Sequence, residues 1–278
     1  MLPLYDENPH RRFPIITILL IVINVWITFQ TARQTPVRQA LVAFQHGFVP
    51  ARLTHIGDAQ PLRIRQPMEV AAGPWGQQAP QQVMLKIDLP NDSASVFGSL
   101  LTSMFLHGSW LHLLSNMWML WIFGNNIEDR LGYVAYSGFY VAGGLVAAIS
   151  QWAIDPESQL PMIGASGAVA AVLGGYALTF PWAKVKTLVF IGIPLILSLP
   201  AFVVLGTWML METVLGIMQI QLGAPTSVAH WAHIGGFVAG LVLMPILAVG
   251  RPPEGQDWNQ ETEALFQFDD PQPLSKRT

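Results

Sequence analysis

The chain has 278 residues, of which 52% are hydrophobic and 11% are charged, and its mean hydropathy is +0.42. Soluble globular domains carry about 25% charged residues, so this deficit indicates an integral membrane protein. The net charge of −3 argues against a nucleic-acid partner, and the absence of cysteine excludes disulfides, thiol nucleophiles and cysteine-ligated metals.

Six apolar stretches predict six transmembrane helices in the lipid bilayer. Most are close to the length of about 20 residues that a helix needs to cross the hydrocarbon. In chain order the predicted spans cover about residues 14–31, 109–125, 131–152, 164–180, 201–218 and 228–249. The run 187–200 is also apolar but contains Pro194 and Pro200, so it is predicted to lead into the fifth span or to belong to a longer, kinked one.

The segments outside the spans complete the predicted domain organisation. Residues 1–13 form an N-terminal segment, 14–249 the six-span domain and 250–278 a tail that is predicted to be disordered. The long first loop, about 32–108, contains a Pro/Gln-rich part at 73–82 that reads as a flexible insertion, and an apolar part at 97–107. No small-residue cleavage site follows the first span, so we expect it to be retained.

The distribution of basic residues predicts the orientation. Loops 153–163 and 219–227 contain no Lys or Arg. Eight basic residues lie in the tails and in the other two short loops: Arg11, Arg12, Arg130, Lys184, Lys186, Arg251, Lys276 and Arg277. Because positive charge favours the cytoplasmic side, we expect a multi-pass protein of the inner (plasma) membrane with both termini in the cytoplasm.

Four polar residues within the predicted spans are candidates for function, because polar groups are costly there. His112 and Asn116 lie four residues apart on one face of the second span, Ser166 near the start of the fourth, and His233 a turn into the sixth. Spans two, four and six all enter from the outer side. The four residues are therefore expected at similar depth, in the outer leaflet.

Small residues recur every four positions on the fourth and sixth spans. They are Gly167, Ala171 and Gly175 on the fourth, and Gly236 and Gly240 on the sixth. Such stripes let helix backbones approach closely, which would bring the Ser166 hydroxyl within hydrogen-bond reach of the His233 imidazole. No acid lies near His233 in the sequence, and Glu212 on the fifth span is the nearest intramembrane candidate, at a depth that the sequence leaves open.

Seven short motifs follow one another in an order that resembles the rhomboid family of intramembrane serine proteases, of bacterial type. They are Arg11-Arg12-Phe13-Pro14, Gly47-Phe48-Val49-Pro50, Thr102-Ser103-Met104-Phe105-Leu106-His107-Gly108, His112-Leu113-Leu114-Ser115-Asn116, Glu128-Asp129-Arg130-Leu131-Gly132, Gly164-Ala165-Ser166-Gly167 and Ala232-His233-Ile234-Gly235-Gly236. The resemblance covers nearly the whole chain.

This resemblance implies an all-α membrane protein, a six-helix rhomboid-like bundle with a short fourth helix. It implies that Ser166 is the nucleophile and His233 the general base, and that His112 and Asn116 line the oxyanion site. Substrates would be membrane proteins whose transmembrane helix unwinds near the outer surface. No metal or cofactor is implied, and the oligomeric state is left open.

Two residues depart from the pattern of related sequences. His230 stands where an aromatic residue is common, and Ala170 where some members have a ring that packs on the catalytic histidine. We take His233 rather than His230 as the base because it directly precedes the Ile-Gly-Gly run.

Less specific interpretations remain beside the protease. Ser166 alone would be explained by helix packing, and His112 with Asn116 by hydrogen bonds between spans. His107, before the second span, is expected at the membrane interface. The main alternative function is a proteolytically inactive rhomboid-like protein that binds membrane proteins. A transporter would be expected to show intramembrane charge pairs and repeated halves, which are not visible.

Overall fold

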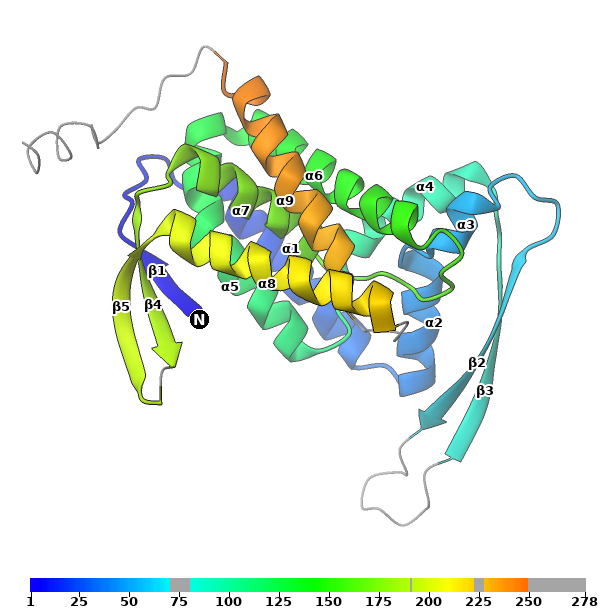
Figure 1. Cartoon of the computed structure of the whole chain (residues 1–278). Helices are drawn as coiled ribbons and strands as arrows, with labels where there is room; N and C mark the ends of the chain where they lie inside the picture. The colour runs from blue at the N-terminus through cyan, green and yellow to red at the C-terminus, as the bar shows by residue number, and fades with distance from the viewer. Residues whose placement is uncertain (71–80, 191, 223–227, 250–278) are drawn as a thin grey trace, which may run out of the picture.

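A computed structural model describes residues 1–70, 81–190, 192–222 and 228–249. Helices packed side by side form the body of the molecule, and two β-hairpins project from it (Figure 1). Six helices match the predicted spans: α1 (Ile15–Ala32), α5 (Trp110–Leu131), α6 (Tyr133–Ile154), α7 (Ser166–Thr179), α8 (Ala201–Leu222) and α9 (His230–Leu247). The predicted tail 250–278 lies outside the described residues.

Four helices in the described part of the chain, α1, α6, α8 and α9, are long and apolar enough to cross a membrane. Helix α7 is shorter, with 14 residues. Helix α5 is as long as α6, with 22 residues, but it is not among the four apolar helices. Its polar residues lower its hydropathy; they include His112, Asn116, Asn125 and Asn126. The chain is therefore a multi-pass membrane protein, although the count of six spans rests on the sequence.

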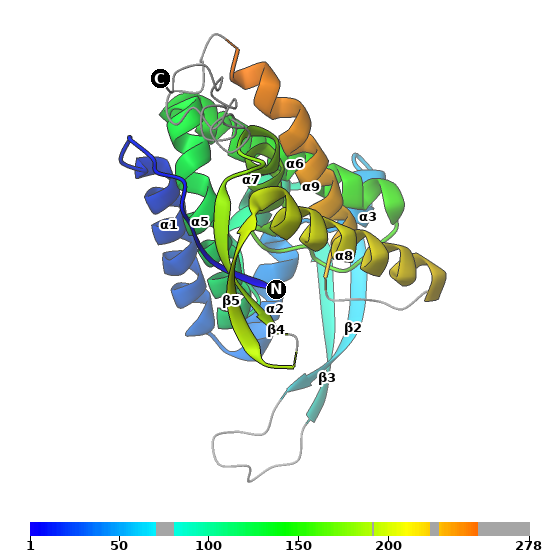
Figure 2. The same cartoon turned by 60° about the vertical axis from the view of Figure 1, so that its left-hand side comes forward.

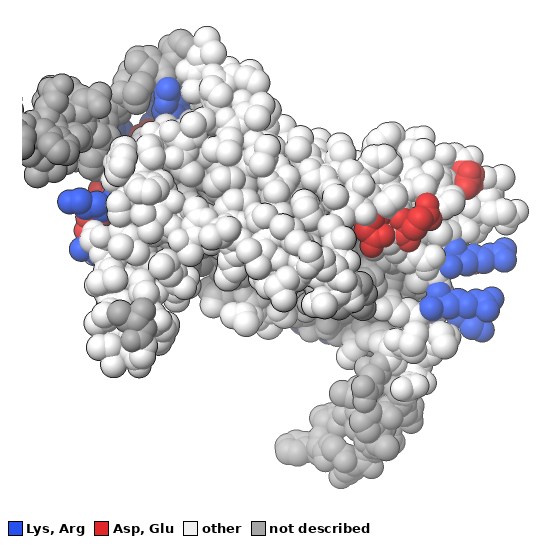
Figure 3. All heavy atoms as spheres, viewed as in Figure 1, with Lys and Arg blue, Asp and Glu red and all other residues white. Residues whose placement is uncertain are grey.

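On the face shown in Figure 3, charged side chains gather at two ends of the helical body, and the surface between them is largely uncharged. One end, here called the amino-terminal end, holds Asp129, Lys186 and the segment that leads into α1. The opposite end, here called the loop-one end, holds His55 and Glu157. An uncharged belt between two charged ends is the surface that a protein spanning a bilayer presents to lipid.

The expectation of an all-α fold is wrong in two places, loop one and the apolar run 187–200, and the described residues of that run are not helical. This run falls within a hairpin of β4 (Lys184–Phe190) and β5 (Pro194–Pro200), and β1 (Leu2–Asp6) pairs antiparallel with β4 to give the order β1-β4-β5. Along β4 buried and more exposed residues alternate, as in a half-buried strand. Two prolines disfavour a helix here, and as β5 is an edge strand its missing N–H groups can be tolerated.

This three-stranded sheet links α5 to α8 (Figure 2). The indole Nε1 of Trp118 on α5 donates to the carbonyl of Pro3 on β1 at 2.8 Å. At the other edge β5 runs directly into α8, whose first N–H, from Ala201, donates to the carbonyl of Ala183 at 2.8 Å.

The first loop is folded rather than extended. It contains α2 (Pro36–His46), α3 (Pro50–Thr54), β2 (Leu62–Val70), β3 (Gln81–Leu89), α4 (Ser93–Thr102) and the short 3-10 helix η1 (Ser103–Phe105). A small core of its own includes Phe44, Val49, Ile64, Leu85 and Leu89. Most of the predicted insertion at 73–82 lies outside the described residues, and the described part of the surrounding chain forms the β2-β3 hairpin.

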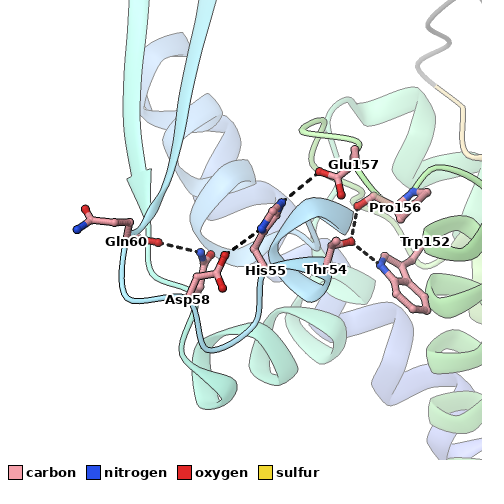
Figure 4. A network of polar contacts seen from close by, with 8 residues as sticks. Thr54, His55, Asp58, Gln60, Trp152, Pro156 and Glu157 are labelled. Atoms are coloured by element: carbon pink, nitrogen blue, oxygen red, sulfur yellow. Dashed lines mark hydrogen bonds and ion pairs between the residues drawn. The ribbon is translucent and has the colours of Figure 1, made fainter.

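Contacts from α3 hold the loop that leads to α7 (Figure 4). The hydroxyl of Thr54 donates to the carbonyl of Pro156 at 2.7 Å and accepts from the indole of Trp152 at 3.0 Å. His55 bridges Asp58 and Glu157 with its two ring nitrogens, at 3.0 and 3.2 Å. Loop one therefore helps to fix the segment that precedes Ser166.

At the amino-terminal end, α1 begins on a buried carboxylate. Glu128 of α5 accepts from the backbone N–H of Ile16 and Thr17, both at 2.8 Å, and from the Thr17 hydroxyl at 2.7 Å. A negative charge at a helix N-terminus satisfies free N–H groups and interacts favourably with the helix dipole. This contact fixes α1 against α5.

Candidate active site

Ser166 is the first residue of α7, which is enclosed by α5, α6, α8 and α9. The preceding residue, Ala165, makes no side-chain cap, so the first N–H groups of α7 keep their hydrogen-bonding capacity. Gly164 has φ +129°, a backbone conformation that side chains with a Cβ rarely adopt. The chain therefore turns sharply and presents Ser166, half-buried, at the positive end of a helix.

His112 and Asn116 lie against this turn. A Cβ placed on Gly164 would lie 2.7 Å from Nε2 of His112 and 3.7 Å from Nδ2 of Asn116. Both side chains project from the first two turns of α5, whose N-terminus is capped where Oγ of Ser109 accepts from the His112 N–H at 3.1 Å. The structure thus brings both residues to the backbone two positions before Ser166.

His107 joins the same cluster, although the sequence predicted an interfacial position. Its side chain is buried, and its Nε2 lies 3.0 Å from Nδ2 of Asn116. Because the amide nitrogen donates, Nε2 accepts and the proton of the neutral ring is on Nδ1. Burial, with a smaller contribution from the neighbouring His112, lowers the pKa of His107 to about 4, so the ring is neutral at physiological pH. Sequence spacing could not reveal this, since the burial depends on tertiary contacts such as those of His107 with Asn116 and His112.

A cavity of about 450 Å³ adjoins His107 at the loop-one end. Its polar lining includes Thr28 of α1 and Gln39 of α2, with Ser109 from the start of α5. The cavity places a neighbouring space, lined mostly by apolar side chains, between the first loop and the helices.

Helices α7 and α9 touch backbone to backbone. A Cβ on Gly236 would collide with the carbonyl oxygen of Gly167, and a Cβ on Gly240 with that of Ala171. The predicted small-residue contact between these helices is confirmed. His233 stands one turn before Gly236 on α9, and Ser166 stands next to Gly167 on α7, so the close contact brings their backbones together.

The acid whose depth the sequence left open, Glu212, contacts both histidines of α9. Its Oε2 lies 2.8 Å from Nδ1 of His233 and 2.8 Å from Nδ1 of His230. An ionised carboxylate only accepts hydrogen bonds, so each imidazole carries its proton on Nδ1 and leaves Nε2 free to accept. The dyad predicted without a third member therefore has a carboxylate behind His233.

An aromatic ring also supports His233, but from a different helix than related sequences suggested. The ring centroid of Trp208 on α8 lies 6.0 Å from that of His233, with an interplanar angle of 36°. Ala170 itself is buried beside Gly236. The support missing at Ala170 is thus supplied by α8, which also carries Glu212.

The assembled groups have the elements of nucleophilic catalysis. A hydroxyl at the start of a helix follows, by two positions, the backbone that amide and imidazole side chains contact, and these side chains can donate to an oxyanion. An imidazole on a contacting helix is oriented by a carboxylate, which fixes the tautomer that a general base requires.

Comparison with known proteins agrees with the motifs. The family model described as Rhomboid domain matches residues 95–249. RHOMBOID-like protein 5 of Arabidopsis thaliana is 28% identical over 158 residues, which cover 56% of this chain and 45% of that protein. Rhomboid-like protein 11, chloroplastic, of the same plant is 28% identical over 150 residues, 53% of this chain and 51% of that protein. Rhomboid protein 1, mitochondrial, of Saccharomyces cerevisiae is 27% identical over 170 residues, 58% of this chain and 43% of that protein. The chain thus spans about half the length of these curated relatives.

Proposed function

This chain belongs to the rhomboid family, and on that premise we propose that it is an intramembrane serine endopeptidase that cleaves transmembrane segments of other membrane proteins. The observation that carries the proposal is the backbone contact between α7 and α9 at Gly167 and Gly236, beside Ser166 and His233. A purely structural serine would not require a carboxylate-oriented histidine on the helix next to it.

In the proposed acylation step, Oγ of Ser166 attacks the carbonyl carbon of the scissile peptide while its proton passes to Nε2 of His233. The new C–O bond forms as the carbonyl electrons move to the oxygen. That oxyanion is stabilised by the Ser166 N–H and by donors on His112 and Asn116. Because the Asn116 amide has two N–H groups, one can remain on His107 while the other is directed to the oxyanion.

The tetrahedral intermediate then collapses. The C–N bond breaks, the proton on His233 passes to the leaving nitrogen, and an ester to Ser166 remains. A water molecule, deprotonated by the same imidazole, attacks this ester and regenerates the serine hydroxyl. Throughout, Glu212 holds the Nδ1–H of His233 and stabilises the imidazolium that forms, and it is thus a positioning residue rather than a reacting one.

We further propose the plasma membrane, with the amino-terminal end of the bundle on the cytoplasmic side and the loop-one end outside. The support is the basic residues at the amino-terminal end, including Arg12 and Lys186, and the loops without Lys or Arg at 153–163 and 219–227. The chain has no cysteine, so single-cysteine variants give a clean labelling test. In intact cells an impermeant maleimide should label Glu157→Cys and not Glu7→Cys; the reverse would invert the proposed orientation.

A fluorophosphonate probe tests the enzyme directly. The probe should label the wild type and the control Ser137→Ala, whose hydroxyl donates to the carbonyl of Tyr133 within α6, but not Ser166→Ala. Cleavage of a transmembrane substrate in proteoliposomes should be lost in Ser166→Ala and His233→Ala. Unlabelled wild-type protein without cleavage would favour the alternative, a non-proteolytic member that binds membrane proteins. Cleavage by Ser166→Ala would refute the assigned nucleophile.

A further inference from the structure

Three ligating side chains converge behind the proposed base. Glu212 of α8 and His230 and His233 of α9 offer one carboxylate oxygen and two Nδ1 atoms, all within 4.8 Å of one another. The side chains are 9%, 9% and 12% exposed, respectively. His230 and His233 are three residues apart and share a face of α9, so both rings reach the same carboxylate.

We propose that this cluster is an inhibitory binding site for a divalent transition-metal cation, with Zn²⁺ as the best match. Two imidazole nitrogens and one carboxylate oxygen form a donor set that is common at three-ligand zinc sites, where water takes the fourth position. The carboxylate also supplies negative charge, which favours a cation in this partly dehydrated place.

Metal binding requires the three side chains to rearrange within the cluster. Tetrahedral Zn²⁺ with ligands at about 2.0–2.1 Å places the ligand atoms about 3.3–3.4 Å from one another. The two oxygen–nitrogen distances are now 2.8 Å, and the three ligand atoms lie within 4.8 Å of one another. The carboxylate therefore moves outward, and the two Nδ1 atoms turn toward each other around the metal. Gly216 lets α8 lie close to His230, because a Cβ there would lie 3.3 Å from Cβ of His230.

Metal binding at this position would remove the general base. A coordinating nitrogen must present a lone pair, so each Nδ1 gives up the proton that it now donates to Glu212. Transfer of that proton to Nε2 keeps the imidazole neutral, but Nε2 of His233 then carries hydrogen and cannot accept the proton of Ser166. The cation would therefore compete with the catalytic tautomer without occupying the position of the substrate.

Binding is tested with Co²⁺ as a spectroscopic substitute for Zn²⁺, on the full-length, tag-free protein in detergent. Titration should give one equivalent of bound Co²⁺ with the intense visible absorption of a four-coordinate site. His230→Phe and Glu212→Gln should each weaken binding at least tenfold. The matched control is His55→Ala, because His55 lies between Asp58 and Glu157 on the surface. Unchanged binding in His230→Phe, loss of binding in His55→Ala, or no binding by the wild type would refute the site.

The inhibitory consequence rests on the proposed function, whereas binding does not. Zn²⁺ should inhibit cleavage by the wild type, and a chelator should restore the cleavage. The His230→Phe variant should be at least tenfold less sensitive to Zn²⁺, with its rate measured relative to its own rate without metal. Co²⁺ binding by a protein that cleaves nothing would retain the metal site and reject the protease. Cleavage without metal binding would reject the site and retain the protease. Equal inhibition of the wild type and His230→Phe would contradict this mode of inhibition.

Discussion

Nδ1 of His233 donates a hydrogen bond to Oε2 of Glu212 over 2.8 Å, from α9 to α8. This single contact settles the tautomer of the imidazole, because the carboxylate cannot donate. It also places a negative charge where an imidazolium would form during proton transfer from Ser166. Nothing within α9 supplies such an acid, so the orientation of the proposed base depends on the packing of α8.

Glu212→Gln should lower kcat at least about tenfold with little change in KM, because the amide still fills the space but carries no charge to stabilise the imidazolium. Loss of the charged member of a soluble Ser-His-Asp triad costs about 10⁴-fold, which sets an upper limit. Steady-state cleavage in proteoliposomes measures this split, and fluorophosphonate labelling should slow in parallel. A raised KM at constant kcat would contradict the positioning role.

Gly236→Ala should abolish most of the cleavage activity. The added Cβ meets the carbonyl oxygen of Gly167 and lies 3.2 Å from Cβ of Ala170, so α9 must move away from α7. Overpacking of this kind costs about 1–3 kcal/mol, and a shift of about 1 Å in catalytic groups can lower the rate about 100-fold. The control is Gly206→Ala on α8, where an added Cβ meets no atom within 4 Å. Activity and unfolding should be measured on both; equal activities would show that the close contact is not needed.

The raised pKa of Asp6 should make the folded protein less stable toward unfolding as the pH rises from about 4 to 6. Burial raises its pKa from 3.8 to about 6, despite hydrogen bonds from the hydroxyl of Tyr176 at 2.7 Å and the amide of Asn126 at 2.8 Å. The folded state therefore binds the proton more tightly than the unfolded state. The free energy of unfolding should decrease across this window by about 2–3 kcal/mol, at about 1.4 kcal/mol for each pKa unit.

Asp6→Asn should remove that dependence, since the amide keeps a carbonyl acceptor for Tyr176 and has no charge to bury. Equilibrium unfolding in mixed micelles at pH 4.5 and 7.5 measures both proteins. The variant is expected to be the more stable one at pH 7.5. The same slope with pH in the variant would mean that Asp6 is not the responsible group.

His55 should titrate above its ordinary pKa of 6.5. The hydrogen bond to Asp58 and then that to Glu157 raise the pKa of this exposed imidazole. Since the folded-state pKa is the higher one, the bridge between α3 and the α6–α7 loop is fully formed below pH 6.5 and is lost as the pH rises through the raised value. NMR of selectively labelled histidine follows the titration, and His55→Ala assigns the signal.

Asp58→Asn and Glu157→Gln should each lower the pKa of His55 toward 6.5, because each removes a hydrogen-bonded negative charge. A wild-type value at or below 6.5 would exclude the bridge in solution.

Local patterns in the sequence were sufficient for much of the fold. The lengths of the apolar stretches and the low charge predicted a membrane protein with six helical stretches. This was possible because the composition of each stretch indicates whether it lies in lipid or in water. The glycine spacing predicted which faces of α7 and α9 meet, since a stripe of small residues is itself a packing surface. These two signals, with the motif order, were enough to propose Ser166 and His233.

Features that depend on partners far away in the chain were decided by the tertiary structure alone. The run 187–200 is apolar enough for a helix, but its described residues include strands. These strands form because β4 and β5 pair with each other and β4 also pairs with β1 from the start of the chain. His107, near the end of loop one, is buried, and its ring contacts Asn116 of α5. Glu212 was visible as an acid in an apolar stretch, but only the rotation of α8 against α9 turns its carboxylate toward His233, and no local periodicity records that rotation.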